Sequence, residues 1–306
     1  MTHGDAGAAG WLLPALVALP AALYLLGVTR WQHRRTRAWS RWRTGSWLLG
    51  LLLVAAALAP PLAAAGHADP RAHMVQHLLL GMYAPLALVL AAPVTLLLGG
   101  ATPGGNLRRR VTRLLRSRPV HVLGHPLAAA ALVTGGLWLL YTTPLYAATL
   151  QHPAVHHGVH AHFLASGALF AWAVAGPDPA PRRPGTAVRA AGLLLAAAGH
   201  AVLAKLLYAR AGAWPPGSGQ APRDLQEAAQ LMYYGGDGAE LVLALALFAG
   251  WYRRAGRRLP AAGSPWRVSS PPRAAGRVRW TSAGAATPRH RRWAPAPGRG
   301  QSGSPR

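Results

Sequence analysis

The chain has 306 residues, of which 52% are hydrophobic and 13% are charged, a balance that disfavours a soluble globular domain and indicates folding in a lipid bilayer. Lys and Arg total 32 against 7 Asp and Glu, but these basic residues alternate with long apolar segments, so nucleic-acid binding is not expected. The absence of cysteine excludes disulfides, thiolate metal ligands and a thiol nucleophile.

Apolar windows close to or above the roughly 18 residues needed to cross a bilayer occur seven times along the chain. A basic segment such as "RWQHRRTRAWSRWR" follows every odd-numbered window, whereas the segments after the even-numbered windows are less basic. Since cytoplasmic loops carry an excess of Lys and Arg, the N-terminus is predicted outside and the C-terminus inside. The predicted fold class is an all-α, polytopic membrane helix bundle with seven transmembrane helices. We place these helices at residues 11–29, 46–65, 73–99, 125–147, 156–176, 187–208 and 227–252.

The end of the chain differs in composition from the rest. Residues 259–306 are rich in Pro, Gly, Ser and Arg and contain no acidic residue. Such a segment cannot bury enough apolar surface to order itself. We therefore predict a transmembrane bundle at residues 1–258 and a disordered, basic cytoplasmic tail at residues 259–306.

Histidines are concentrated at the predicted outer ends of the third and fifth spans. The motif "HMVQH" contributes His73 and His77, and "HHGVH" contributes His156 and His160. Residues four apart lie on one face of a helix, within about 6 Å of each other. Although a single interfacial histidine is usually structural, two such pairs at the same depth predict a metal or haem site.

Further polar side chains near the two pairs are expected to assist the site. The carboxylates Asp69, Asp224 and Glu227 lie in predicted outer loops, where they could compensate the charge of a bound cation. Possible additional ligands or entry residues flank the pairs in sequence. They are His152, His157, His162 and Met74.

Three ionisable residues lie deep within predicted spans: His200 in the sixth, and Asp237 and Glu240 in the seventh. Counting at about 1.5 Å per residue from the outer ends puts His200 and Asp237 at a similar depth, which predicts that they form a pair. Ionisable residues in a membrane are costly and commonly functional. They could orient a metal-bound histidine, accept protons or pass an ion inward, and a structural interhelical hydrogen bond is an equal alternative.

Three segments together resemble the CtaG family of bacterial cytochrome c oxidase assembly factors, and the similarity extends from Trp11 to Arg258. The segments are "HMVQHLLLGMYAPLALVLAAPVTLLL", "HHGVHAHFLASGALFAWAVAGPDP" and "AQLMYYGGDGAELVLALALFAGWYRR". The most specific features are the two H-x-x-x-H motifs, a following phenylalanine, and a closing Asp-Pro pair. These residues are His73, His77, His156, His160, Phe163, Asp178 and Pro179.

The resemblance implies a multi-pass protein of the bacterial cell membrane that helps to build a haem–copper oxidase. Its implied partners are the oxidase subunits, with other copper chaperones as a second candidate class. The resemblance also supplies the metal, because imidazole alone suits copper, zinc, iron and nickel alike. We therefore expect a non-enzymatic protein that binds and delivers copper at the outer face through His73, His77, His156 and His160.

Two other functions fit the same sequence. The first is a transmembrane redox protein that holds haem b by bis-histidine ligation, which predicts a Soret absorption band. The second is a copper or proton-coupled transporter, in which His200, Asp237 and Glu240 form a path below the outer site. This transporter predicts metal flux into proteoliposomes that is lost on replacing Asp237 by Asn.

Overall fold

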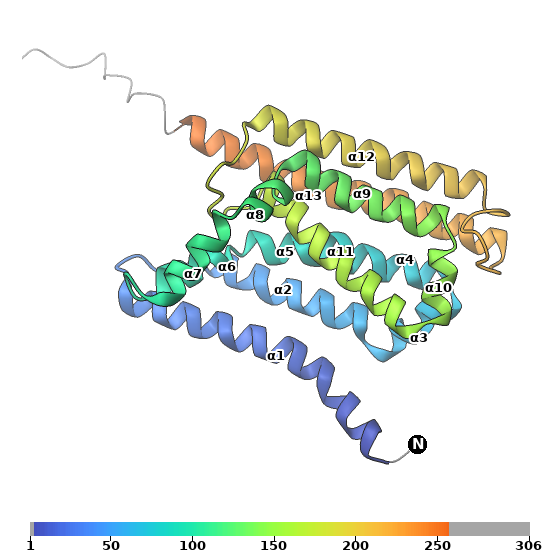
Figure 1. The fold of residues 1–306 in the computed structure, drawn as a ribbon, viewed down its shortest axis with the longest axis horizontal. Coiled ribbons are helices and arrows are strands. Elements are labelled where there is room, and N and C mark those ends of the chain that lie inside the picture. The colour runs from blue at the N-terminus through green and yellow to red at the C-terminus, as the bar shows by residue number, and fades with distance from the viewer. Residues whose placement is uncertain (1–2, 257–306) are drawn as a thin grey trace, which may run out of the picture. The chain divides into compact units, whose positions relative to one another are not determined.

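The computed structural model describes residues 3–256, with side chains from residue 13 onward, and these residues form helices without a β-strand (Figure 1). The predicted all-α class is confirmed for this part of the chain, and the predicted tail at residues 259–306 lies outside it. In chain order the elements are α1 (His3–Arg34), α2 (Arg41–Leu58), α3 (Pro60–Ala68), α4 (Pro70–Leu78), the π-helix η1 (Leu79–Tyr83), α5 (Ala84–Leu90), α6 (Pro93–Gly100), α7 (Asn106–Leu115), α8 (Arg118–Leu123), α9 (Pro126–Thr142), α10 (Leu145–Gln151), α11 (Pro153–Val174), α12 (Thr186–Ala209) and α13 (Pro222–Gly256).

Several of these helices are long and apolar enough to cross a membrane. Four qualify alone: α1 from Leu13 to Arg34, the unit α4 to α6, α12 and α13. Two bent pairs, α2 with α3 at 51° and α9 with α10 at 76°, raise the number to six if each pair is one span. Among the described residues, α11 is not one of these candidates, since its first half carries four histidines. The count of seven spans and their orientation therefore stay predictions.

Five elements close into a ring of packed helices. The unit α4–η1–α5 packs against α11, α11 against α9, α9 against α12, and α12 against α13, which returns to α4. Helices α1 and α2 lie outside this ring, against α6 and α5 respectively (Figure 1). The arrangement encloses the inner faces of α4, α11, α12 and α13, which carry most of the predicted site residues.

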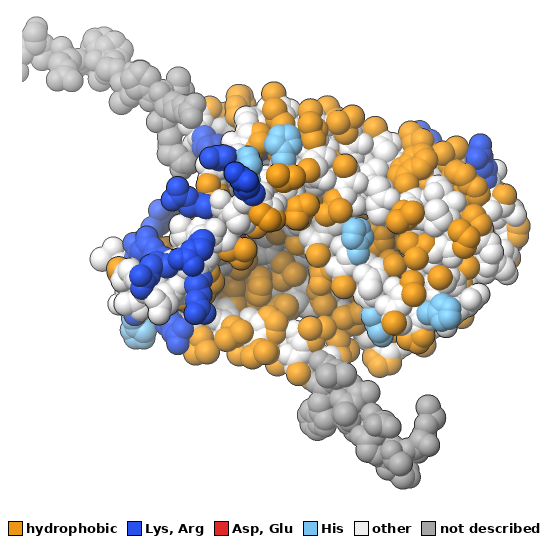
Figure 2. All heavy atoms as spheres, in the orientation of Figure 1, with side chains coloured by type: hydrophobic (Ala, Val, Ile, Leu, Met, Phe, Trp, Pro, Cys, Tyr) orange, Lys and Arg blue, Asp and Glu red, His pale blue; other side chains and the backbone are white. Residues whose placement is uncertain are grey.

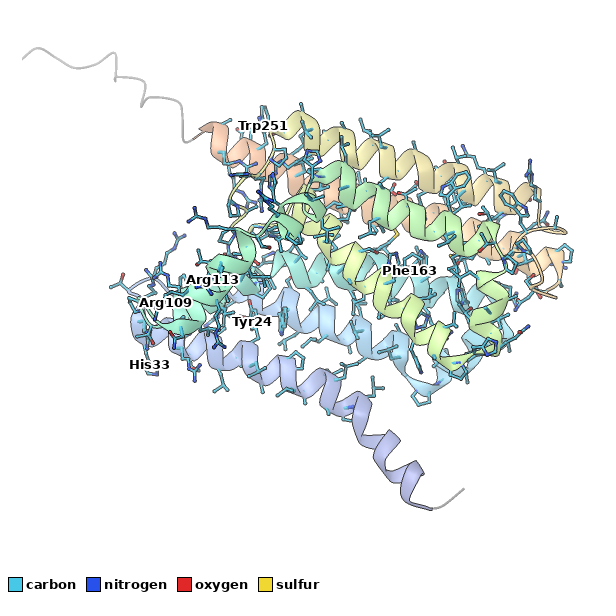
Figure 3. All side chains as sticks on the ribbon, in the orientation of Figure 1. Tyr24, His33, Arg109, Arg113, Phe163 and Trp251 are labelled. Carbon is cyan, nitrogen blue, oxygen red and sulfur yellow. The ribbon has the colours of Figure 1, made fainter. Side chains whose placement is uncertain are left out.

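The two ends of the bundle carry different side chains. The histidine end is formed by α3, α10 and the first turns of α4, α11 and α13, and the arginine end by α7, α8, the end of α1 and the start of α12. Figure 2 shows Lys and Arg side chains gathered over one end of an otherwise largely hydrophobic face. Arg109 and Arg113 of α7 lie at that end, together with His33 of α1, and Phe163 of α11 lies towards the other end (Figure 3).

The unit α4 to α6 is interrupted between α5 and α6 at Ala92, which has a left-handed backbone with φ of 56°. Carbonyls near the break are bonded by side chains from other helices. The Tyr24 hydroxyl donates to the Ala91 carbonyl at 2.9 Å, and the Ser46 hydroxyl donates to the Ala87 carbonyl at 2.7 Å. Since lipid offers no hydrogen-bond partner to a free carbonyl, α1 and α2 stabilise this interruption.

Asp178 of the Asp-Pro pair has a structural position in the loop between α11 and α12. It is buried, and its carboxylate accepts hydrogen bonds from the backbone N–H and hydroxyl of Thr95, both at 2.6 Å, and from the Val94 N–H at 3.1 Å. The first N–H groups of a helix have no partner within the helix and favour a negative charge. Asp178 therefore caps the N-terminus of α6 from a distant part of the chain.

Candidate metal site at the histidine end

Four imidazoles from three helices meet at the histidine end, and we call them the histidine cluster: His67 of α3, His73 of α4, and His156 and His160 of α11. The ring centroids of His156 and His160 are 4.1 Å apart, and those of His67 and His156 are 4.4 Å apart. The His73 ring lies 6.4 Å from both His156 and His160. Two imidazoles bound to one ion at about 2.0–2.1 Å have centroids roughly 4.5–6.3 Å apart. The four rings therefore lie close to the spacing that a shared ion requires.

Three rings of the histidine cluster are buried and have nitrogen atoms without hydrogen-bond partners among the described residues. His73, His156 and His160 are each more than nine-tenths buried. Among the described residues, no partner reaches Nδ1 of His73, Nδ1 of His156 or either ring nitrogen of His160. A buried polar atom left without a partner costs about 1–3 kcal/mol. These nitrogens are the atoms with which imidazole binds a metal.

The histidine cluster is not yet arranged as a closed metal site. Within the described part of the chain, no three His, Asp or Glu side chains stand in positions that would hold a metal ion together. The 4.1 Å separation of His156 and His160 is shorter, and the 6.4 Å separations from His73 are slightly longer, than two ligands of one ion need. Binding would therefore require rotation of these side chains.

The structure divides the four predicted ligands. His77 lies one turn beyond His73, and its ring packs edge-on against Phe163 with a centroid separation of 4.6 Å. It lines a cavity deeper in the ring of helices together with His200 and Glu240. Thus His73, His156 and His160 come together as predicted, whereas His77 belongs to a separate, deeper group.

His67 joins the histidine cluster although sequence spacing did not select it. It lies six residues before His73, so the two could not be assigned to one face of a continuous helix. The chain breaks between α3 and α4 at Asp69, whose carboxylate accepts from the Arg71 N–H at 2.8 Å and caps α4. This break allows the ring of His67, an exposed residue, to lie against that of His156. The only signal in the sequence was a histidine beside a helix-breaking Asp-Pro.

The predicted helper histidines lie in different environments. His157 is exposed, with its ring centroid 5.7 Å from that of His156, so it borders the histidine cluster. His152 is exposed and precedes the first turn of α11. His162 is half-buried and directed towards Gly136 of α9, away from the cluster. Only His157 is therefore placed to assist.

Met74 lies in the hydrophobic core of the ring. Its side chain is 2% exposed, and its sulfur accepts a hydrogen bond from the Tyr141 hydroxyl at 3.9 Å. Tyr141 and Met74 belong to one cluster of buried residues that joins α4, α9, α12 and α13. Met74 therefore packs in the core and is engaged by Tyr141.

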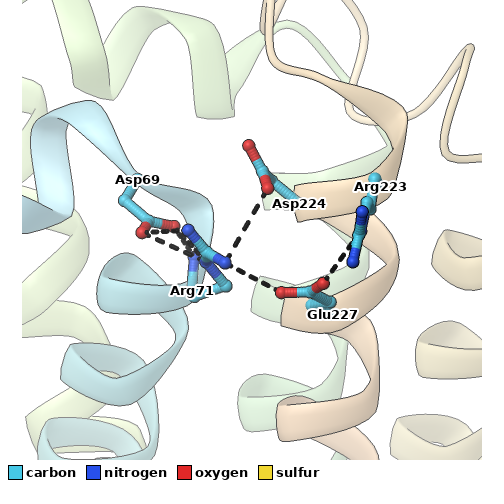
Figure 4. Close-up of polar contacts among 5 residues, drawn as sticks. All are labelled: Asp69, Arg71, Arg223, Asp224 and Glu227. Atoms are coloured by element: carbon cyan, nitrogen blue, oxygen red, sulfur yellow. Dashed lines mark hydrogen bonds and ion pairs between the residues drawn. The ribbon is translucent and has the colours of Figure 1, made fainter.

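The carboxylates expected to compensate a cation form an ion-pair network next to the cluster (Figure 4). Arg71 contacts Asp69 at 2.9 Å, Glu227 at 2.8 Å and Asp224 at 3.9 Å, and Arg223 contacts Glu227 at 3.3 Å. The hydrogen bond from Arg71 lowers the pKa of Asp69 below its ordinary value. Three carboxylates against two guanidinium groups leave the network itself with one net negative charge, and the network ties α4 to α13.

The predicted pair of His200 with Asp237 is wrong. Nδ1 of His200 lies 3.6 Å from Oε1 of Glu240, and Asp237 is exposed on the outer side of α13. At about 100° per residue, Glu240 lies only about 40° around the helix from the buried Gly236, whereas Asp237 lies about 100° away. Counting residues along the helices gave no information about which side chain of α13 faces inward.

Comparison with known proteins gives a family match across most of the bundle and curated relatives of about half of the chain. Residues 22–254 match the family of cytochrome c oxidase caa3 assembly factors. The uncharacterized proteins Mb0105 of Mycobacterium bovis and MT0111 of Mycobacterium tuberculosis are each 36% identical over 157 residues, covering 49% of this chain and 24% of theirs. ML1998 of Mycobacterium leprae is 31% identical over 181 residues, covering 56% of this chain and 28% of its own. The chain thus spans about a quarter of the length of these curated relatives, and no solved structure matches it.

Proposed function

Because the chain belongs to the family of cytochrome c oxidase caa3 assembly factors, we propose that it aids assembly of the oxidase by binding copper as cargo in the histidine cluster. The matched residues, 22–254, contain every member of the cluster. Membership of the family indicates that the protein whose assembly is aided is a cytochrome c oxidase. The expected partners are therefore oxidase subunits and other copper chaperones. The role requires no catalytic step.

The observation that carries this proposal is the convergence of buried imidazoles that lack hydrogen-bond partners. His73, His156 and His160 offer four such nitrogens, and imidazole is a good ligand for copper. With no cysteine in the chain, binding would lack thiolate, the ligand that holds copper most firmly. A site of imidazoles alone suits a protein that must release its cargo.

The ion-pair network supports the same proposal through its charge. Its net negative charge lies next to the histidine cluster, where it favours the approach of a cation. Arg71 of α4 contacts Asp69, the N-cap of α4, and Glu227 of α13. These ion pairs join α4 to α13 at the histidine end without using a histidine of the cluster.

We further propose that the histidine end faces the outside of the bacterial cell membrane. The arginine end carries α7, on which Arg108, Arg109, Arg110 and Arg113 are all exposed. An excess of basic residues marks the cytoplasmic side of a membrane protein. The histidine cluster would then be open to copper donors and oxidase subunits on the outer side, in a bundle of seven spans.

The spacing of the cluster favours a single small ion over haem. A haem with two axial histidines needs a slot of macrocycle size between their rings. The ring centroids of His156 and His160 are only 4.1 Å apart, and the centroid of the tilted His67 ring lies 4.4 Å from that of His156. These contacts fill the space beside His73 with side chains.

The proposal is tested in a bacterium whose oxidase depends on this protein. His73→Ala and His160→Ala should each lower both oxidase activity and the copper content of the purified oxidase. His121→Ala is the matched control, because His121 is exposed at the arginine end, and it should leave both values unchanged. Normal activity and copper content in both cluster variants, with the protein present in the membrane, would contradict the proposal.

A further inference from the structure

A cavity of about 50 Å³ lies inside the ring of five elements, deeper than the histidine cluster. All five elements contribute to its lining, and its ionisable side chains are His77, His200 and Glu240. A buried water needs roughly 10–15 Å³ of such space. The cavity is therefore large enough for an ion together with a few water molecules.

The distance between His200 and Glu240 fits a shared ion better than a hydrogen bond. Nδ1 of His200 and Oε1 of Glu240 are 3.6 Å apart, which is too long for an N–H···O hydrogen bond. Two atoms that bind one ion at about 2.0–2.2 Å stand roughly 2.9–3.7 Å apart when the angle at the ion is about 90–120°. The two side chains thus flank a position of the right size for a metal ion. A third ligand would have to rotate towards it, because no three His, Asp or Glu side chains of the described residues already stand in positions that would hold one ion.

The ring nitrogens around this position have no other partner. His200 is 2% exposed and His77 is 4% exposed. No described residue provides a hydrogen bond to either nitrogen of His200 or to Nε2 of His77. A Cβ atom at Gly236 would overlap the His200 ring, so the glycine on α13 provides the room in which this ring lies.

His77 lies between the histidine cluster and the pair formed by His200 and Glu240. It lies one helical turn from His73, about 6 Å along the same face of α4, and it lines the cavity that holds His200 and Glu240. A carboxylate deep in a membrane protein is costly when unpaired, and a bound cation would offset its charge. The outer cluster lacks a carboxylate ligand, whereas this deeper group has one.

We propose that His77, His200 and Glu240 form an inner binding position for the cargo copper ion, reached from the histidine cluster through His77. This inference rests on the proposed function. It predicts that each chain has two positions for copper: an outer one built only of imidazoles, and an inner one built of two imidazoles and a carboxylate. Such a mixed nitrogen and oxygen set is suited to a transition-metal ion.

The test is to count copper ions on the purified full chain in detergent. The protein is loaded with Cu(I) under reducing conditions in the presence of a competing chelator, and bound copper is measured by elemental analysis. We expect two ions on the unchanged protein and one on His200→Ala and on Glu240→Gln. Asp237→Asn is the matched control, because it alters an exposed carboxylate one turn away on the same helix, and it should retain two.

A change in shape without loss of a ligand gives an independent test. Gly236→Ala should push the His200 ring from its place, because the added Cβ would overlap it. We expect the copper affinity of the inner position to fall at least tenfold, with that of the outer position unchanged. Two unaltered affinities in a folded Gly236→Ala protein would overturn the inner position.

The outcomes separate the inner position from the proposed function. One ion on the unchanged protein, lost in His160→Ala but kept in His200→Ala and Glu240→Gln, would overturn the inner position and leave the proposed function standing. The proposed function and the inner position would both be overturned if the unchanged protein bound no copper, or if copper binding were unaltered in His73→Ala and His160→Ala. Two ions on the unchanged protein, of which one is lost in His160→Ala and the other in His200→Ala and Glu240→Gln, with both kept in Asp237→Asn, would support the inference.

Discussion

The histidine end and the arginine end of the bundle both carry many nitrogen-containing side chains, but in opposite environments. At the histidine end, His73, His156 and His160 are buried with ring nitrogens that lack partners among the described residues. At the arginine end, Arg109 and Arg113 are exposed on α7. Burial without a partner is costly, while an exposed guanidinium is solvated or can contact lipid headgroups. The comparison shows that environment, more than abundance, identifies which group is suited to bind a ligand.

The largest expected difference between the two ends is in access from outside the cell. The chain has no cysteine, so a single introduced cysteine reports one position. His157→Cys should react with a membrane-impermeant maleimide in spheroplasts, whereas Arg109→Cys should react only after permeabilisation, because both positions are exposed but at opposite ends. The reverse labelling pattern would contradict the proposed orientation.

The next largest effect concerns copper affinity. Replacing His156 and His160 together by Ala removes two of the four converging imidazoles, and we expect the Cu(I) affinity of the outer position to fall about 100-fold or more, or about 2.7 kcal/mol. Arg109→Ala and Arg113→Ala at the other end should leave it unchanged. The affinities are measured by competition with a Cu(I) chelator, and equal losses at both ends would break the comparison.

A moderate effect is expected where the arginine end is stabilised by a buried carboxylate. Asp178→Ala leaves the Val94 N–H and the Thr95 N–H and hydroxyl without their acceptor, which should lower the free energy of unfolding by about 1–3 kcal/mol. Asp178→Asn retains an acceptor oxygen and should cost less. Thermal unfolding in detergent measures both, and a loss of copper binding in a folded Asp178→Ala protein would contradict the structural role.

The smallest effect is expected in the exposed ion-pair network. Arg71→Ala removes one positive charge from the histidine end and frees Asp69, Asp224 and Glu227. Exposed ion pairs contribute little to stability, but the added negative charge should speed copper uptake a few-fold at low ionic strength. The increase should disappear at high salt. An uptake rate that falls in this variant would show that the network has another role.

The sequence allowed the helical class and part of the site to be predicted, because both depend on local periodicity. The pair His156 and His160 was found from its spacing of four on one helix, and His73 from the matching motif. His67 was not selected because it joins the cluster across the break at Asp69 between α3 and α4. No count of residues along one helix reports such a contact.

The deeper group was only partly predicted, for a different reason. His200 was selected from its place within an apolar segment, but its partner depended on the rotation of α13, which turns Glu240 towards it and leaves Asp237 exposed. In the same way, His77 shares a helix face with His73, yet packing against Phe163 places it at the cavity. Such choices are made by tertiary packing between helices.

The central claim is that copper is bound by the imidazoles of the histidine cluster. X-ray absorption at the copper edge, on the purified chain loaded with one equivalent of Cu(I), tests it most directly. We expect a first shell of nitrogen at about 1.9–2.1 Å with the outer-shell scattering typical of imidazole. In a protein that also carries His200→Ala and Glu240→Gln, so that the inner position cannot bind copper, replacing both His73 and His160 by Ala should abolish this signal. An unchanged spectrum in that variant, or a first shell dominated by sulfur, would contradict the claim.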